Sequence, residues 1–130
     1  MSDVPEQLSY TREHEWVRRE ADGSVVIGIT DHAQHQLGEL VYVELPDAGR
    51  RLAGGDAMAV VESTKAASDV YAPVRGSIVL ANPALSAEPE LVNTDPYGKG
   101  WLVRLKPDES AELDALMDAR AYQDFLDTAG

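Results

Sequence analysis

The fold of this chain is decided by residues 60–70, which read Val60-Val61-Glu62-Ser63-Thr64-Lys65-Ala66-Ala67-Ser68-Asp69-Val70. A β-branched apolar run precedes Lys65, and a second strand-like run follows it. Small or short side chains flank the lysine, and glycine-containing turns lie beyond both runs, at residues 54–56 and 72–76. The pattern predicts a β-hairpin with Lys65 at its apex and nothing bulky beside its ε-amine.

Outside this hairpin, short apolar runs alternate with turn residues. Asp22-Gly23 is predicted to join two strands, and Thr30 or Asp31 to cap a short helix through residues 35–37 that ends at Gly38. Residues 82–100 are rich in Pro, Gly, Asn and Ser, so an irregular stretch with a helical turn near 90–92 is expected. The predicted strands are residues 15–19, 24–29, 40–45, 57–63, 67–72, 76–81 and 101–106.

Short strands separated by turns favour a mainly β fold, a small flattened barrel or sandwich, over a parallel sheet. Helical spacing appears in the tail at residues 108–116, with Ser110 as the expected cap, and at residues 119–126. The apolar stripe of the tail is expected to pack onto the barrel. With 130 residues, the chain fits a single domain over residues 1–130, with a β core at about 10–106 and a helical tail at about 108–126.

The charge balance excludes several classes of partner. Eleven basic and 23 acidic residues give a net charge of −12, which repels nucleic acids and anionic membranes. The acidity fits basic docking faces on partners and equally fits a role in solubility alone. No apolar run approaches the roughly 20 residues of a membrane span, and the first residues show no signal peptide, so a bacterial-type cytoplasmic location is expected.

The side chains of this sequence offer little chemistry of their own. The chain has no cysteine, so a redox role would need a borrowed group. His32 and His35 are three residues apart, but no further ligands accompany them, and no metal site is expected. No phosphate-binding loop or nucleophile elbow is present. A lone lysine in a turn is most often simply solvated, so the case for Lys65 depends on its surroundings.

Those surroundings carry a family resemblance. Glu62-Ser63-Thr64-Lys65-Ala66 resembles the attachment motif of lipoyl domains and lacks the methionines that flank the lysine of biotinyl domains. The chain resembles the H protein of the glycine cleavage system from about residue 10 to residue 125, with Thr64 where many relatives have valine. The further matching blocks are His14-Glu15-Trp16-Val17, Gly28-Ile29-Thr30-Asp31-His32-Ala33-Gln34, Val43-Glu44-Leu45-Pro46, Tyr71-Ala72-Pro73-Val74-Arg75-Gly76, Pro89-Glu90-Leu91-Val92-Asn93 and Asp95-Pro96-Tyr97-Gly98-Lys99-Gly100-Trp101.

The resemblance implies a fold of the lipoyl/biotinyl-carrier type and a monomeric, non-catalytic carrier. Lipoate would be attached covalently to Lys65 by lipoyl-attaching enzymes, which would read the motif residues Glu62, Ser63, Thr64 and Ala66. The arm would take the aminomethyl group of glycine from a pyridoxal-phosphate-dependent glycine decarboxylase to a tetrahydrofolate-dependent aminomethyltransferase. A flavin-containing dihydrolipoyl dehydrogenase would then reoxidise the arm, so the hard chemistry belongs to cofactors.

The resemblance also implies a cleft in which the loaded arm is sheltered from water. Glu15 and Asp69 match acidic residues that hold the amine, and carboxylates suit that task because charge-assisted hydrogen bonds are strong. Glu13 stands where some relatives have serine. The alternative interpretation of Glu15 and Asp69, which is less favoured, is that they are solvated surface charges.

Two other functions remain open from the sequence. The same carrier could serve chiefly as a lipoyl donor for 2-oxoacid dehydrogenases, a role that involves the same residues and would be separated by neighbouring genes. A chain whose Lys65 is never modified would instead be a β-barrel interaction module.

Overall fold

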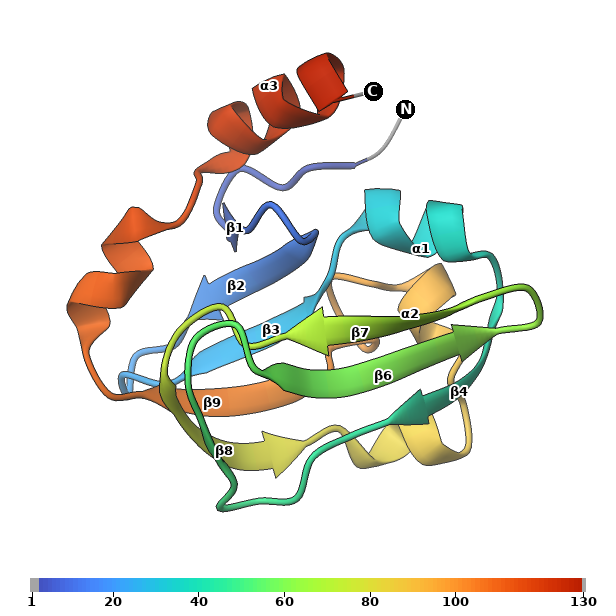
Figure 1. Ribbon diagram of the computed structural model, residues 1–130, viewed down its shortest axis with the longest axis horizontal. Helices are drawn as coiled ribbons and strands as arrows, with labels where there is room; N and C mark the ends of the chain where they lie inside the picture. The colour runs from blue at the N-terminus through green and yellow to red at the C-terminus, as the bar shows by residue number, and fades with distance from the viewer. Residues whose placement is uncertain (1–2, 130) are drawn as a thin grey trace.

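Two antiparallel sheets surrounded by short helices make up the computed structural model, which describes residues 3–129 (Figure 1). Strands follow the order β1-β2-β3-β9-β8-β5 in the larger sheet and β4-β6-β7 in the smaller one. The strands are β1 (Ser9–Tyr10), β2 (Glu15–Arg19), β3 (Val25–Ile29), β4 (Leu40–Glu44), β5 (Arg51–Leu52), β6 (Ala57–Ser63), β7 (Ala67–Tyr71), β8 (Gly76–Ala81) and β9 (Val103–Pro107). The α-helices are α1 (Asp31–Leu37), α2 (Leu91–Thr94) and α3 (Ala119–Ala129), and the 3₁₀-helices are η1 (Pro83–Ser86) and η2 (Ser110–Ala115).

The turn residue and the helix caps that the sequence predicts lie at the predicted positions in the structure. Gly23 adopts a φ of 88° in the β2–β3 turn, a conformation that costs glycine little. The side chain of Thr30 accepts a hydrogen bond from the Ala33 amide and so caps α1, and Gly38 ends this helix with a φ of 83°. The mainly β fold class is therefore confirmed, together with the capped helix between β3 and β4.

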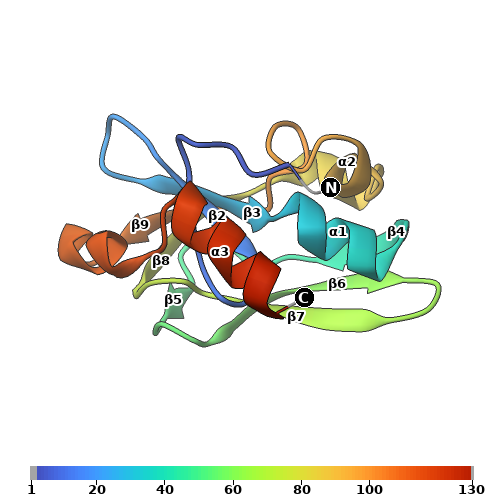
Figure 2. The ribbon, with the colours of Figure 1, turned by 90° about the horizontal axis from the view of Figure 1, so that it is seen from above.

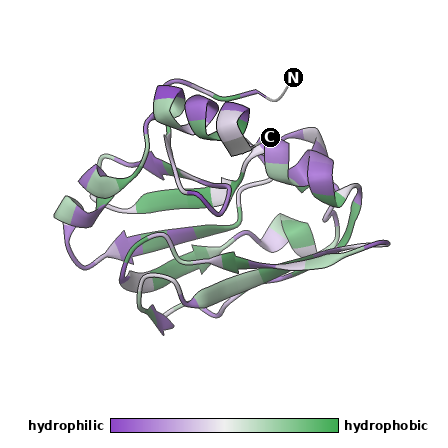
Figure 3. Ribbon diagram, turned by 45° about the horizontal axis from the view of Figure 1, so that its top comes forward, coloured by the Kyte–Doolittle hydropathy of each residue, from purple (hydrophilic) through white to green (hydrophobic). Residues whose placement is uncertain are grey.

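The hydrophobic core lies between the two sheets. All five residues of β3 are buried, because both faces of this strand are covered: Val25, Ile27 and Ile29 belong to the core between the sheets, and Val26 belongs to a second buried cluster. Val43 and Val61 are paired across β4 and β6, and both are buried in this core. Figure 3 shows the corresponding pattern, with strands coloured largely as hydrophobic and α1 more hydrophilic.

A second cluster of buried side chains joins the tail to the larger sheet. Trp16 is fully buried and lies so close to Gly28 that a Cβ there would come within 2.6 Å of the indole nitrogen. The Tyr122 ring of α3 stacks on Tyr10 at a centroid distance of 4.7 Å, and both rings are buried. Seen from above, α3 therefore lies over the edge of the larger sheet near β2, as the sequence predicted for the tail (Figure 2).

Several boundaries differ from the predictions. Strand β9 begins at Val103 rather than at residue 101, because the Trp101 amide closes a turn onto the carbonyl of Gly98. The predicted helix over residues 108–116 is the 3₁₀-helix η2, and Glu109 rather than Ser110 occupies its cap position. The predicted turn near 90–92 is the helix α2. Strands β1 and β5 and the 3₁₀-helix η1 were not predicted, because they are too short for a periodic sequence pattern to reveal.

Candidate functional site

Lys65 lies in the turn between β6 and β7, the narrow loop that extends furthest to the right in Figure 1. The backbone of Ser63 donates a hydrogen bond to the carbonyl of Ala66 (2.8 Å) and closes this turn. The Ser63 hydroxyl accepts hydrogen bonds from the amides of Lys65 (3.3 Å) and Ala66 (3.2 Å), an arrangement typical of serine-stabilised turns. The predicted hairpin is therefore present, with Lys65 at its apex.

The surroundings of the lysine are open. Thr64, Lys65 and Ala66 are exposed, and within residues 3–129 no ion pair reaches the Lys65 ammonium group. Glu62 is half-buried on β6, where it is paired with Ala67 across the hairpin. The aliphatic stem of Lys65 passes Gly38, at which a Cβ would lie 3.3 Å from the Lys65 Cε atom. The turn thus holds its backbone firmly and leaves the amine accessible.

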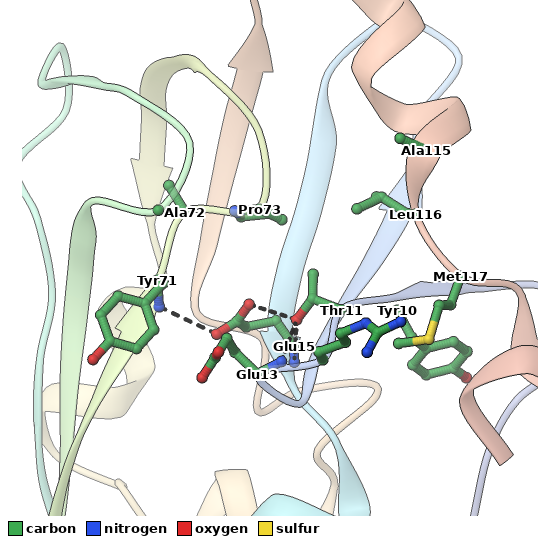
Figure 4. A pocket seen from close by; sticks show the side chains of 12 residues that line it. Tyr10, Thr11, Glu13, Glu15, Tyr71, Ala72, Pro73, Ala115, Leu116 and Met117 are labelled. Carbon is green, nitrogen blue, oxygen red and sulfur yellow. Dashed lines mark hydrogen bonds between the residues drawn. The ribbon is translucent and has the colours of Figure 1, made fainter. Parts of the chain in front are cut away.

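A cleft of about 480 Å³ lies beyond the opposite end of β7, and we call it the Glu15 cleft (Figure 4). Four segments that are distant in sequence form its walls: the β1–β2 loop with Glu15 at the start of β2, Gly55 in the β5–β6 turn, the end of β7, and the chain from the end of η2 towards α3. Tyr71 and Lys65 are six residues apart, which corresponds to roughly 20 Å along an extended strand. The cleft and the lysine turn therefore lie at the two ends of one strand.

Glu15 is the buried carboxylate of this cleft. Its side chain is 2% exposed, accepts a hydrogen bond from the Thr11 hydroxyl (2.7 Å to Oε1) and accepts another from the Tyr71 amide (3.2 Å to Oε2). Burial raises the pKa of Glu15 to about 7, the two hydrogen bonds counteract that rise, and the nearby Glu13 carboxylate adds to it. Glu15 therefore changes its charge near neutral pH.

Asp69 does not line the Glu15 cleft. It is exposed on β7 and paired with Val60 of β6, and with Glu44 and Arg50 it lines a separate hollow of about 300 Å³. Tyr71, two residues further along β7, does line the Glu15 cleft. The two predicted acidic residues, Glu15 and Asp69, thus line two different hollows, and their shared role stays a prediction.

Beside the cleft, His14 forms a small cluster. Its Nδ1 atom lies 2.8 Å from the Tyr122 hydroxyl, and its ring centroid is 4.7 Å from that of His32. Among the residues that the structure describes, no group of three or more His, Asp and Glu side chains is placed to hold a metal ion. In the same part of the chain, every helix is too short or too polar to cross a membrane.

Comparison with known proteins identifies the family. A family model described as "Glycine cleavage H-protein" matches residues 8–129. The chain belongs to the glycine cleavage H-protein family. A glycine cleavage system H protein of Halorhodospira halophila is 58% identical over 130 residues, with all of both chains covered. Another, from Escherichia coli O139:H28, is 54% identical over 127 residues, which is 98% of each chain.

A solved structure supports the same assignment. The crystal structure of a glycine cleavage system H protein from Mycobacterium marinum superposes with a TM-score of 0.84 at 40% sequence identity. The superposition covers 93% of this chain and 97% of that one. The predicted resemblance to the H-protein family and the predicted fold class are both confirmed, and membership of this family supports a carrier role in glycine cleavage.

Sequence reasoning missed part of the Glu15 cleft. Thr11 and the Tyr71 amide bind the two oxygens of Glu15, and Leu116 and Met117 of the tail form the facing wall. The isolated bridge between Tyr10 and Met117 brings that wall into place. A hydroxyl four residues before a glutamate was the one local signal available, whereas the other contacts join segments that are 50 or more residues apart.

Proposed function

We propose that Lys65 carries covalently attached lipoate and that the chain moves the aminomethyl group of glycine between the enzymes of glycine cleavage. These are a pyridoxal-phosphate-dependent decarboxylase, a tetrahydrofolate-dependent aminomethyltransferase and a flavin-containing dihydrolipoyl dehydrogenase, and the chain meets them in the cytoplasm. The observation that carries the proposal is an exposed lysine, without an ion-pair partner among residues 3–129, at the apex of a firmly hydrogen-bonded hairpin.

The residues around Lys65 fit such a group. Attached lipoate supplies the sulfur atoms that hold the aminomethyl group in transit. Amide formation removes the charge of the lysine, and within the described residues no carboxylate partner would be left unpaired by that loss. The Ser63-stabilised turn keeps the base of the arm rigid, so the reach of the arm is set by its own length.

The attachment site is tested by intact mass, with protein taken from cells supplied with lipoate. The chain has three lysines, and Lys99 and Lys106 are exposed like Lys65, so they provide matched controls. We expect one lipoyl increment in the wild type, in Lys99→Arg and in Lys106→Arg, and none in Lys65→Arg. An unmodified wild type in cells that lipoylate another acceptor would refute the proposal.

We further propose that the Glu15 cleft shelters the loaded arm and that Glu15 binds its ammonium group. The support is a buried carboxylate facing a cleft in which no ion pair to it is formed by the described residues. Asp69 lies two residues before Tyr71 on the strand that leads from Lys65, so it would meet the arm on its way to the cleft. Because residues of the tail line the Glu15 cleft, we infer that the β core and the tail act as one carrier domain.

The sheltering role is tested with Glu15→Gln, which keeps the shape of the side chain and removes its charge. We expect lipoylation to proceed as in the wild type, because Glu15 lies at the far end of β7 from Lys65. The loaded variant should release its aminomethyl group several-fold faster at pH 8, measured as formaldehyde and ammonia. Equal release rates for the two proteins would refute a role for Glu15.

A further inference from the structure

The partners of the Thr11 hydroxyl fix which group donates in its hydrogen bond to Glu15. Its oxygen accepts from the backbone amides of Glu13 and Glu15, each at 3.2 Å. A hydroxyl has two acceptor positions and one hydrogen, so both acceptor positions are occupied. Its hydrogen is therefore donated to the Glu15 carboxylate, 2.7 Å away.

A hydrogen bond donated by Thr11 favours the ionised form of Glu15. A carboxylate that accepts a hydrogen bond is stabilised in its charged form, whereas burial disfavours that form. The Tyr71 amide, which is also a fixed donor, binds the other oxygen at 3.2 Å. Each oxygen of Glu15 thus has one protein donor, and its remaining acceptor capacity is available to the cleft.

The charged groups around Glu15 leave its charge uncompensated. Glu13, in the β1–β2 loop, adds like charge. Arg12 also lines the cleft, but its guanidinium lies over the Phe125 ring of α3, 5.6 Å from the ring centroid, and within residues 3–129 it forms no ion pair with Glu15. The Tyr122 hydroxyl of α3 stays neutral, because burial raises its pKa to about 12. From β7, the group that reaches Glu15 is an uncharged amide.

We propose that Thr11 is a positioning residue for Glu15: its hydroxyl orients the buried carboxylate and holds it in the ionised form that binds an ammonium group in the cleft. This inference rests on the proposed function of the cleft. Thr11 acts through Glu15 and need not touch the arm. Its effect is to extend sheltering of the arm down to neutral pH.

The first experiment measures the protonation of Glu15 in the unloaded protein, by carboxyl ¹³C NMR over pH 4–10. Thr11→Val keeps the branched shape without the hydroxyl, Thr11→Ala is a second variant without it, and Thr11→Ser keeps it. Losing a hydrogen bond to a charged group should raise the titration midpoint of Glu15 by about one pH unit in Thr11→Val and in Thr11→Ala. Glu15 should titrate in Thr11→Ser as it does in the wild type. An unchanged Glu15 midpoint in folded Thr11→Val or Thr11→Ala protein would overturn the proposal.

The second experiment follows release of the aminomethyl group from loaded protein at pH 7 and pH 9. A midpoint near 7 leaves about half of Glu15 ionised at pH 7, and a rise of one unit leaves about a tenth. Release from Thr11→Val should therefore be up to about fivefold faster than from the wild type at pH 7 and nearly equal at pH 9. Thr11→Ser should behave like the wild type at both values.

The two proposals fail in different ways. If Glu15→Gln speeds release and Thr11→Val does not, despite a raised midpoint, the role of Thr11 is refuted and that of Glu15 stands. If neither variant speeds release, the sheltering role of the cleft is refuted, and with it the inference that depends on it. The NMR titration keeps these outcomes separate, because it does not require a loaded arm.

Discussion

Glu15 lowers the stability of the folded protein at neutral pH. Its pKa is raised from 4.5 to about 7 by burial, so the folded state binds a proton that the unfolded state has already released. Between these two values, the free energy of unfolding falls as pH rises, and above pH 7 the charged carboxylate costs on the order of 3 kcal/mol. The proposed binding of an ammonium group gives this cost a function.

Replacing that carboxylate should stabilise the protein in a pH-dependent way. We expect Glu15→Gln to raise the free energy of unfolding by about 2 kcal/mol at pH 8, somewhat less than the full cost because its amide cannot accept from both donors. At pH 4.5 the wild type is protonated at Glu15, and the difference should largely disappear. Urea unfolding of Glu15→Gln and the wild type measures the difference in free energy of unfolding at each pH. A variant that is less stable than the wild type at pH 8 would contradict the destabilising role of the Glu15 charge.

At the scale of elements, the Tyr122 hydroxyl links α3 to α1 and to the β1–β2 loop, in addition to the packing of its ring on Tyr10. Tyr122 Oη lies 2.8 Å from the Thr30 hydroxyl that caps α1 and 2.8 Å from His14 Nδ1 in the β1–β2 loop. Because Thr30 also accepts from the Ala33 amide, the cap of one helix and the docking of another share a single hydrogen-bonded chain. The position of α3 is thus coupled to the β1–β2 loop, which ends directly before Glu15.

Tyr122→Phe tests this coupling, because it keeps the ring that stacks on Tyr10 and removes the hydroxyl. We expect a loss of about 1–2 kcal/mol in the free energy of unfolding, since two polar groups lose a buried partner. Amide hydrogen exchange in α3 should accelerate more than exchange in β3. Asp124→Asn, on the exposed face of α3, serves as the control, and equal exchange in the Phe and Asn variants would contradict the coupling.

At the scale of the whole molecule, the sequence predicted what local chemistry determines. The apex position of Lys65, the Thr30 cap and the Gly38 helix end each depend on a few adjacent residues, and the structure contains all three. The shift of the last strand to Val103 arises from a turn at Gly98, which strand propensity does not reveal.

The cleft could not be predicted in this way. The Tyr71 amide and Glu15 are 56 residues apart, and the bridge from Tyr10 reaches Met117, so the cleft exists once the sheets and the tail have come together. Family resemblance supplied Glu15 but not its donors. Resemblance also grouped Glu15 with Asp69, although the two side chains line different hollows.

The wall formed by Leu116 and Met117 has a consequence for how this protein ages. The chain between β9 and α3 crosses the surface as a 3₁₀-helix with mostly exposed or half-buried residues, where a protease can cut. Such a nick leaves β6 and β7 covalently intact, and the wall is then held to the larger sheet by the Tyr10–Met117 bridge and the packing of α3 without its covalent link to β9. A nicked molecule keeps Lys65 and its turn, so under the proposed function it would still accept lipoate but would shelter the loaded arm less well.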